Sequence, residues 1–171
     1  SILEAFPLPE AQLDRFLLYI KIQYPTEQEE HTILGNTTGT KKATINKVLE
    51  SKEVLEAQRR VREVHADANV IEWVSALVRS TRPGTSTVPY VNEWVRWGAG
   101  PRAGQAMLLT AKARALMKGR FSVMKDDLLH VAYPVLRHRL LMNFKAEAEG
   151  VSSDDVTRHL LERVPSNSKI V

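Results

Sequence analysis

The chain has 171 residues, of which 43% are apolar and 26% are charged. This length suits one domain, or one domain with part of another, and the composition is that of an ordinary soluble protein. The absence of cysteine excludes disulfides and thiolate metal sites, and the net charge of +4 comes from basic residues interleaved with acids, which favours a solvated surface over a nucleic-acid patch.

The start of the chain shows no basic and apolar pattern of a secretory signal. Its longest apolar stretch, Phe16 to Ile22, is far shorter than the roughly 20 residues that span a bilayer. We therefore expect a cytoplasmic protein without a membrane span.

The first 25 residues differ in character from the rest. Residues 9–15 predict a short helix with Pro9 near its start. The apolar, aromatic-rich segment Phe16 to Ile22 predicts a strand, which Tyr24-Pro25 closes. Because a lone strand is not stable, its partners must lie in another chain or in a missing part of this one.

From Thr26 onward the sequence predicts helices. Thr26 and Glu29 have the spacing of a capping box, and their helix is expected to end at Leu34, before Gly35. Residues 35–46 are polar and loop-like.

Two of the next helices are predicted to begin at Ser51 and to cover residues 69–79, and residues 84–100 look irregular. Pro101 opens the longest predicted helix, which reaches about Lys118. The apolar residues at helical spacing are Val54, Ala57, Val61, Val64, Val70, Val74, Leu77, Val78, Ala103, Ala106, Met107, Ala113 and Met117.

In the C-terminal part, Asp126 and Asp127 are expected in the first turn of a helix, where the helix dipole favours acids. Pro134 is expected to interrupt that helix. The last helix is predicted over residues 154–163, ended by Pro165.

Two possible ligand sites fail on their spacing. Residues 35–44 superficially resemble a phosphate loop, but three residues instead of four separate Gly35 from Gly39, and no Gly-Lys-Ser/Thr ending follows. No histidine pair has metal-binding helical spacing, so no metal site is expected. His138 is flanked by Arg137 and Arg139, and this cluster is expected to bind carboxylates of the chain itself rather than an external anion. The histidines are His31, His65, His130, His138 and His159.

Two arginines are candidates for a phosphate contact. Arg102 stands at a helix start, where a cation opposes the helix dipole unless an anion sits there too, and Gly98 and Gly100 leave room for close approach. Arg15 follows Asp14, which allows either a surface ion pair or an arginine finger that reaches a neighbour's γ-phosphate. The residues alone leave both alternatives open for each arginine.

Five segments carry a resemblance to a known family. Residues 8–16 (LPEAQLDRF) resemble the end of the ATPase core in MoxR-family AAA+ proteins, and residues 98–103 (GAGPRA) resemble the sensor-2 motif of that family. Residues 134–140, 143–144 and 147–151 are similar to its C-terminal signature. The motifs occur in the family's order and span nearly the whole chain.

The resemblance implies a mainly α fold, in which residues 26–171 form a helical-bundle AAA+ lid and residues 1–25 are a helix–strand remnant of the α/β ATPase core. It implies that Arg15 is the arginine finger, acting in trans, and that Arg102 is the sensor-2 arginine. The intact protein is then an ATPase that uses ATP and Mg²⁺ and forms a ring, commonly a hexamer. Its expected work is chaperone-like remodelling or activation of client proteins, often ones with a von Willebrand A domain.

Departures from the family pattern limit what this chain does by itself. It has no Walker A, Walker B or sensor-1 asparagine, so we expect a truncated chain that is inactive alone. Gly100 stands where serine is frequent, and Met124 stands where a helix-capping Thr or Ser is common, which weakens that helix start by about 1 kcal/mol.

Two rival functions remain open. A helical nucleic-acid-binding module would use Trp94 and Trp97 as stacking platforms. A protein-interaction adaptor would dimerise through the apolar segment Phe16 to Ile22.

Overall fold

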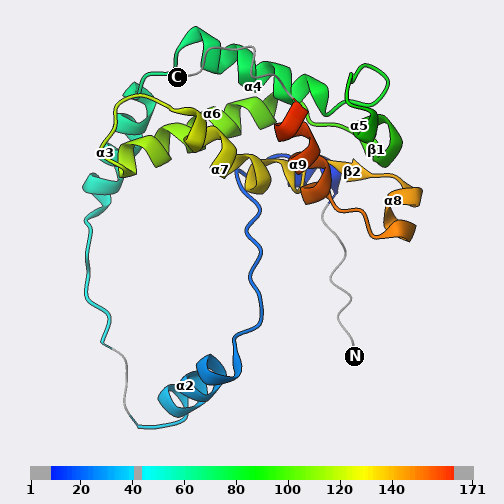
Figure 1. Cartoon of the computed structure of the whole chain (residues 1–171). Coiled ribbons are helices and arrows are strands. Elements are labelled where there is room, and N and C mark those ends of the chain that lie inside the picture. The colour runs from blue at the N-terminus through cyan, green and yellow to red at the C-terminus, as the bar shows by residue number, and fades with distance from the viewer. Residues whose placement is uncertain (1–8, 41–43, 164–171) are drawn as a thin grey trace.

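The computed structural model describes residues 9–40 and 44–163 of the chain, and most of these residues are helical. The predicted mainly α class is confirmed (Figure 1). In chain order the elements are α1 (Glu10–Leu13), α2 (Glu27–Thr37), α3 (Ser51–Glu63), α4 (Ala68–Ser80), α5 (Pro89–Trp94), β1 (Val95–Trp97), α6 (Pro101–Met117), α7 (Lys125–Leu136), β2 (Leu141–Met142), α8 (Phe144–Glu149) and α9 (Ser153–Arg163).

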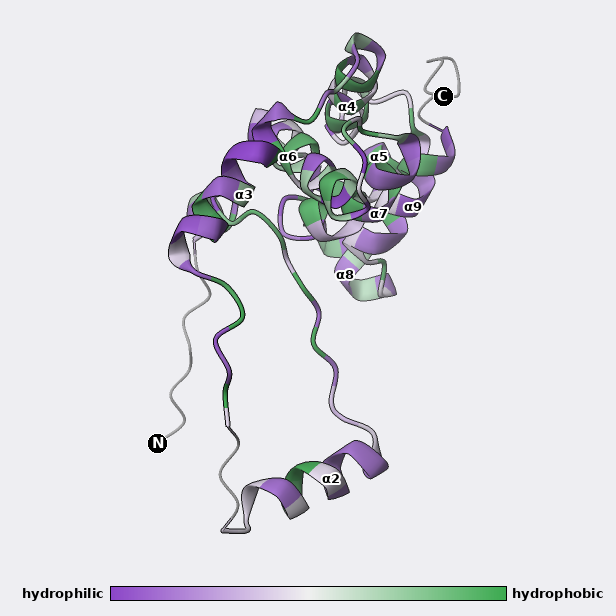
Figure 2. Ribbon diagram, turned by 90° about the vertical axis from the view of Figure 1, so that its left-hand side faces the viewer, coloured by the Kyte–Doolittle hydropathy of each residue, from purple (hydrophilic) through white to green (hydrophobic). Residues whose placement is uncertain are grey.

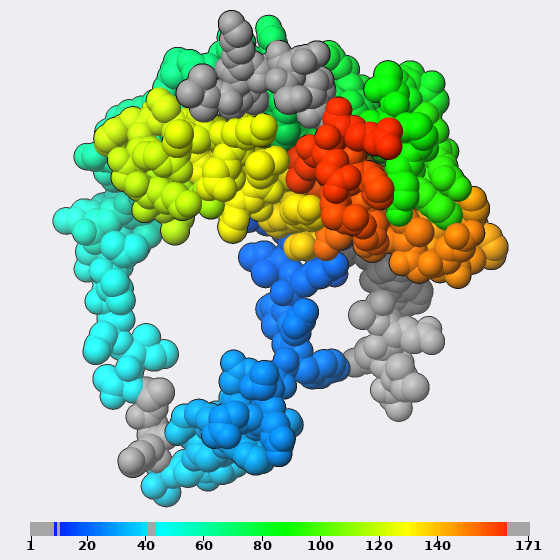
Figure 3. All heavy atoms as spheres, in the orientation of Figure 1, coloured from blue at the N-terminus to red at the C-terminus, as the bar shows by residue number. Residues whose placement is uncertain are grey.

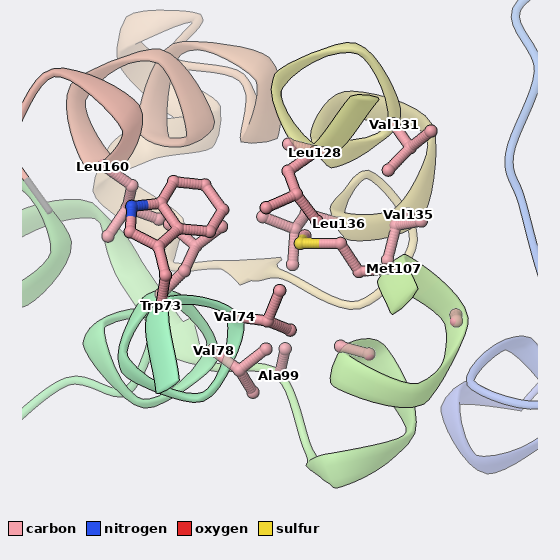
Figure 4. Packing of buried hydrophobic residues seen from close by; sticks show 14 of the residues in the cluster. Trp73, Val74, Val78, Ala99, Met107, Leu128, Val131, Val135, Leu136 and Leu160 are labelled. Atoms are coloured by element: carbon pink, nitrogen blue, oxygen red, sulfur yellow. The ribbon is translucent and has the colours of Figure 1, made fainter. Parts of the chain in front are cut away.

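Helix α6 runs through the middle of the helical body, packed between α4 and α7 (Figure 1). α3 also packs on α6, while α9 packs against α4, α5 and α7. Burial of a shared apolar core stabilises helices of this length, which are marginal in isolation. Figure 4 shows part of this core, with the labelled side chains Trp73, Val74, Val78, Ala99, Met107, Leu128, Val131, Val135, Leu136 and Leu160.

The apolar stripe predicted for α4 is confirmed, because Val70, Val74, Leu77 and Val78 are all buried. Their spacing of three or four residues places them on one face of the helix, toward α6 and α9.

The stripes predicted for α6 and α3 are only partly buried. In α6, Ala103, Ala106 and Met107 are buried, but Met117 is exposed because it is the last residue of the helix, next to the turn at Gly119. No residue of α3 is fully buried, since this helix lies at the edge of the body and packs mainly on α6.

The stretch 84–100 is not irregular as predicted, because it contains α5 and β1. Pro89 is the first residue of α5, where its missing N–H costs no hydrogen bond. β1 pairs antiparallel with β2, and Val95 lies opposite Met142. The elements have six and three residues, too few for a periodic pattern to reveal them.

The predicted strand at 16–22 also needs correction. The segment is extended, but within the described residues it pairs with no strand. Instead, the Tyr19 N–H donates to the carbonyl oxygen of Pro134 in α7 over 2.8 Å. The side chains of Ile20 and Ile22 remain exposed.

Two helix limits differ from the predictions. α2 ends at Thr37 rather than at Leu34. α7 continues past Pro134 to Leu136, so the proline lies inside the helix rather than interrupting it. A proline there removes one N–H donor from the helix, which the remaining packing of α7 offsets.

Helix α2 stands apart from the helical body, carried by two extended segments (Figures 1 and 2). Its predicted capping box is confirmed, since the Thr26 hydroxyl accepts from the Glu29 N–H and the Glu29 carboxylate accepts from the Thr26 N–H. All residues of α2 are exposed, including Ile33 and Leu34. The space-filling view shows the same separation between α2 and the body (Figure 3).

Candidate functional site

The N-terminus of α6 presents Arg102 at the surface. Gly100 is the N-cap residue, Pro101 is the first helical residue, and Arg102 is the second. The first N–H groups of a helix have no partner within it and carry a partial positive charge. Arg102 therefore adds a full charge to an end that already favours anions.

The loop before α6 is fixed to the end of α4. The Thr81 hydroxyl donates to the Val78 carbonyl oxygen over 2.6 Å and accepts from the Ala99 N–H over 2.8 Å. The Arg82 Nε donates to the Ala99 carbonyl oxygen over 3.1 Å. A Cβ at Gly98 would lie only 2.4 Å from the Thr81 carbonyl oxygen, so the close approach requires glycine.

The carboxylate of Asp14 lies between two arginines from distant parts of the chain, Arg102 and Arg139. The Arg139 Nε donates to its Oδ1 over 3.1 Å, and the Arg102 Nη1 donates to its Oδ2 over 3.3 Å. Among the described residues, Arg15 forms no ion pair, with Asp14 or any other acid. The surface pair of Asp14 with Arg15 that the sequence allowed is therefore not formed.

Arg139 is buried and uses all its hydrogen-bond donors. Besides Asp14 Oδ1, it donates to the carbonyl oxygens of Asp14, Phe16, Leu17 and Val135. These five contacts match the five N–H groups of a guanidinium. Burial lowers the pKa of Arg139, and the Asp14 carboxylate opposes that shift.

A hollow of about 240 Å³ lies between α6 and the segment after α1. Its charged lining residues are Asp14, Arg15, Arg102 and Arg139, so three positive charges face one negative charge. The structure thus brings the two predicted site residues, Arg15 and Arg102, to one hollow. An anion such as a phosphate group suits this charge balance.

The neighbouring residues 137 and 138 bind groups of the chain itself. The Arg137 Nε donates to Asp154 Oδ1 over 2.8 Å, and the His138 Nε2 donates to the Phe16 carbonyl oxygen over 3.0 Å. Burial lowers the pKa of His138. The expectation that this basic cluster binds the protein's own carboxylates is confirmed for its two arginines, since Arg137 binds Asp154 and Arg139 binds Asp14, whereas His138 binds a backbone carbonyl.

From the sequence, Asp14 was considered only as a possible partner of Arg15, and Arg139 only as a member of the cluster around His138. A signal was present for Arg139, which lies just past the end of α7 and four residues after the core residue Val135, the spacing that places two residues on the same side of a helix. A buried arginine requires an acceptor for its charge. Nothing in the sequence pointed to an acid 125 residues away as that acceptor.

Other candidate groups are explained by the fold. Of the loop-like residues 35–44, 35–37 belong to α2, and 41–43 lie outside the described residues. Trp94 is buried in the core, which leaves only Trp97, 71% exposed, as a possible stacking platform. Within residues 9–40 and 44–163, no cluster of His, Asp and Glu suited to a metal ion is found, and no helix is long and apolar enough to cross a membrane.

Comparison with known proteins places residues 90–160 in the family described as the AAA lid domain. The chain is 33% identical over 160 residues to the chaperone MoxR1 of Mycobacterium tuberculosis, covering 93% of this chain and 42% of that protein. It is 26% identical over 152 residues to the protein MoxR of Paracoccus denitrificans, covering 82% of this chain and 45% of that protein. The chain thus spans less than half the length of these relatives.

A solved structure from Cytophaga hutchinsonii, of a protein provisionally named an ATPase, has the same fold. It matches with a TM-score of 0.86 and 30% identity, over 94% of this chain and 49% of that one. The match therefore covers nearly all of the chain.

Proposed function

The chain belongs to the MoxR family of AAA+ ATPases, in which it forms the C-terminal region with the lid, and from this membership we propose its work. The lid couples ATP binding and hydrolysis to chaperone-like remodelling or activation of partner proteins. The observation that carries the proposal is the hollow that Arg15 and Arg102 share.

In this proposal Arg15 is the arginine finger and stabilises the charge that develops on the γ-phosphate of a neighbour's ATP. Contacts of this class contribute about 10³–10⁵ in rate. Arg102 is the sensor-2 arginine that links the nucleotide to the position of the lid. Because both arginines border one hollow, we propose that they act on the same nucleotide, so that Arg102 also works in trans.

The remaining parts of the site come from the rest of the protein. ATP supplies the phosphate anion that the hollow suits, whereas the residues described here offer no carboxylate cluster to hold Mg²⁺. The 171-residue chain also has no Gly-x-x-x-x-Gly-Lys-Ser/Thr motif. We therefore propose that this chain alone neither hydrolyses ATP nor binds it tightly, since phosphate-cradling N–H groups are missing.

The partners are proposed on the same basis. A finger that acts in trans requires a neighbouring subunit, so the intact protein forms a ring, for which we propose six subunits. The name of the Mycobacterium relative, a chaperone, supports a client protein as partner. We further propose that the client carries a von Willebrand A domain. We also propose that the protein acts in the cytoplasm.

The test is ATP turnover and nucleotide binding by the intact protein that carries this chain. Arg15→Ala should abolish turnover and leave nucleotide binding unchanged, and Arg102→Ala should lower turnover. Arg96→Ala, which removes an exposed arginine of β1, is the control and should change neither. Unchanged turnover in Arg15→Ala would remove Arg15 from this role.

The isolated chain provides a second test. Calorimetry should detect no micromolar binding of ATP to it. Micromolar binding would show that the chain holds a nucleotide site of its own, contrary to the proposal.

A further inference from the structure

The three arginines at the hollow differ in how many of their N–H groups are already bound. Arg139 uses all five, and its side chain is 2% exposed. Arg102 has one described contact, to Asp14, and its side chain is 56% exposed. Arg15 is exposed and forms no ion pair among the described residues.

These differences separate the arginines by what they can bind. A phosphate needs free N–H donors, which Arg15 and Arg102 have and Arg139 lacks. The contact of Arg102 with Asp14 is long and exposed, and pairs of this kind contribute little stability. A phosphate group in the hollow can therefore replace Asp14 as the partner of Arg102 at a small cost in stability. It cannot replace the partners of Arg139, which has no free donor.

Arg139 fixes the backbone on both sides of Arg15. It binds the carbonyl oxygens of Asp14, Phe16 and Leu17 in addition to the Asp14 carboxylate. The backbone on either side of Arg15 is thus held by Arg139, while the Arg15 side chain is exposed and forms no ion pair among the described residues. Asp14 is the group that both lid arginines share.

We propose that Asp14 is a positioning residue for the two phosphate-binding arginines, an inference that rests on the proposed function. Its Oδ2 holds Arg102 toward the hollow until a phosphate replaces it. Its Oδ1, through Arg139, holds the Arg15 segment at a fixed distance from Arg102. Asp14 itself does not touch the nucleotide.

The test uses Asp14→Asn in the intact protein, which removes the charge and keeps one oxygen acceptor for Arg139. Turnover should fall by at least about tenfold, because the two arginines lose their relative placement. Nucleotide affinity should stay the same or increase, since Arg102 no longer has Asp14 as a competing partner. A purely structural defect would instead weaken binding and turnover together.

Asp154→Asn is the matched control. Asp154 also binds an arginine, Arg137, and its side chain is 26% exposed against 29% for Asp14. It does not line the hollow. This variant should keep turnover and affinity within about twofold of the parent protein, the spread expected for a surface ion pair.

A double variant shows whether Asp14 acts through Arg102. In the Arg102→Ala background, Asp14→Asn should cause no further change in nucleotide affinity, because the partner it releases is already absent. Additive effects on affinity would overturn the inference, as would normal turnover in Asp14→Asn alone.

The outcomes separate this inference from the proposed function. If Arg15→Ala and Arg102→Ala lose activity while Asp14→Asn keeps it, only the positioning role is wrong. If neither arginine variant changes turnover, the proposed function fails first. Should Asp14→Asn unfold at the assay temperature, Asp14→Glu retains the charge and lengthens the side chain, and unchanged turnover in it would likewise overturn the inference.

Discussion

Arg120 binds Asp127 through two hydrogen bonds, 2.8 Å from Nη1 to Oδ2 and 2.7 Å from Nη2 to Oδ1. The Asp127 carboxylate is completely buried at the start of α7, where it also accepts from Arg114 Nη1 over 2.6 Å and from the Met124 N–H over 2.9 Å. It joins the turn after α6 to the first turn of α7. Asp127 therefore supplies the half of a capping box that accepts from the N–H of the N-cap residue, although Met124 has no side-chain oxygen to supply the other half.

Replacing the buried acid should destabilise the helical body strongly. Asp127→Asn leaves two arginines without their shared charge partner, which should lower the free energy of unfolding by about 3 kcal/mol. Asp126→Asn is the control, because its side chain is exposed, and it should cost much less. Urea unfolding followed by circular dichroism measures both, and equal losses would contradict a special role for Asp127.

The same carboxylate predicts how stability depends on pH. Burial alone would raise the pKa of Asp127, but the hydrogen bonds from Arg120, the Met124 N–H and Arg114 hold it well below its usual range. A depressed pKa in the folded state gives stability that is present above the unfolded pKa of about 3.9 and is lost as the pH falls below it.

Between about pH 6 and pH 3, the chain should therefore lose more stability than the Asp127→Asn variant does. Thermal unfolding at a series of pH values measures this difference. Parallel pH profiles for the two proteins would rule out Asp127 as the source.

The close approach at Gly98 predicts a local defect near the candidate site. In Gly98→Ala the new Cβ meets the Thr81 carbonyl oxygen, so the loop before α6 must shift, at a cost of about 1–3 kcal/mol. The shift also moves Arg102, and the intact protein should lose turnover. Gly100→Ala is the control, since its Cβ has nothing within 4 Å and its φ of −86° suits alanine. Comparable losses in both variants would refute the steric explanation.

The capping box of α2 predicts an effect that stays local. Thr26→Ala removes the hydroxyl that accepts from Glu29 and should weaken the helix by about 1 kcal/mol. Because every residue of α2 is exposed, the melting temperature of the helical body should not change. Hydrogen exchange of the α2 amides measures the local effect, and a lower melting temperature would show that α2 supports the body.

Much of the fold could be predicted because its long helices bury regular stripes. The predicted starts of α3, α4 and α6 lie within one residue of the observed starts, which are Ser51, Ala68 and Pro101. The short elements were missed because six residues of α5 and three of β1 carry no periodic signal. The 16–22 segment is predicted as a strand because its sequence is apolar and aromatic-rich. Such a sequence has the same pattern whether the extended segment pairs with a strand or, as here, donates a hydrogen bond to the end of a helix.

The candidate site was predictable only in part. Arg15 and Arg102 were identified through short motifs that resemble a family, and the fold places both at one hollow. The contribution of Arg139 depends on its burial and on backbone oxygens of residues 14, 16 and 17. Such contacts leave no trace in side-chain patterns, so the sequence could not reveal them.

The way in which Arg139 binds residues 16 and 17 has a consequence for the evolution of this protein. Every amino acid carries a carbonyl oxygen, so Phe16 and Leu17 can be exchanged for other residues without loss of these acceptors. Position 139 has no such freedom, because no other side chain offers five donors in one plane. Divergent descendants should therefore vary at 16 and 17 while arginine persists at 139.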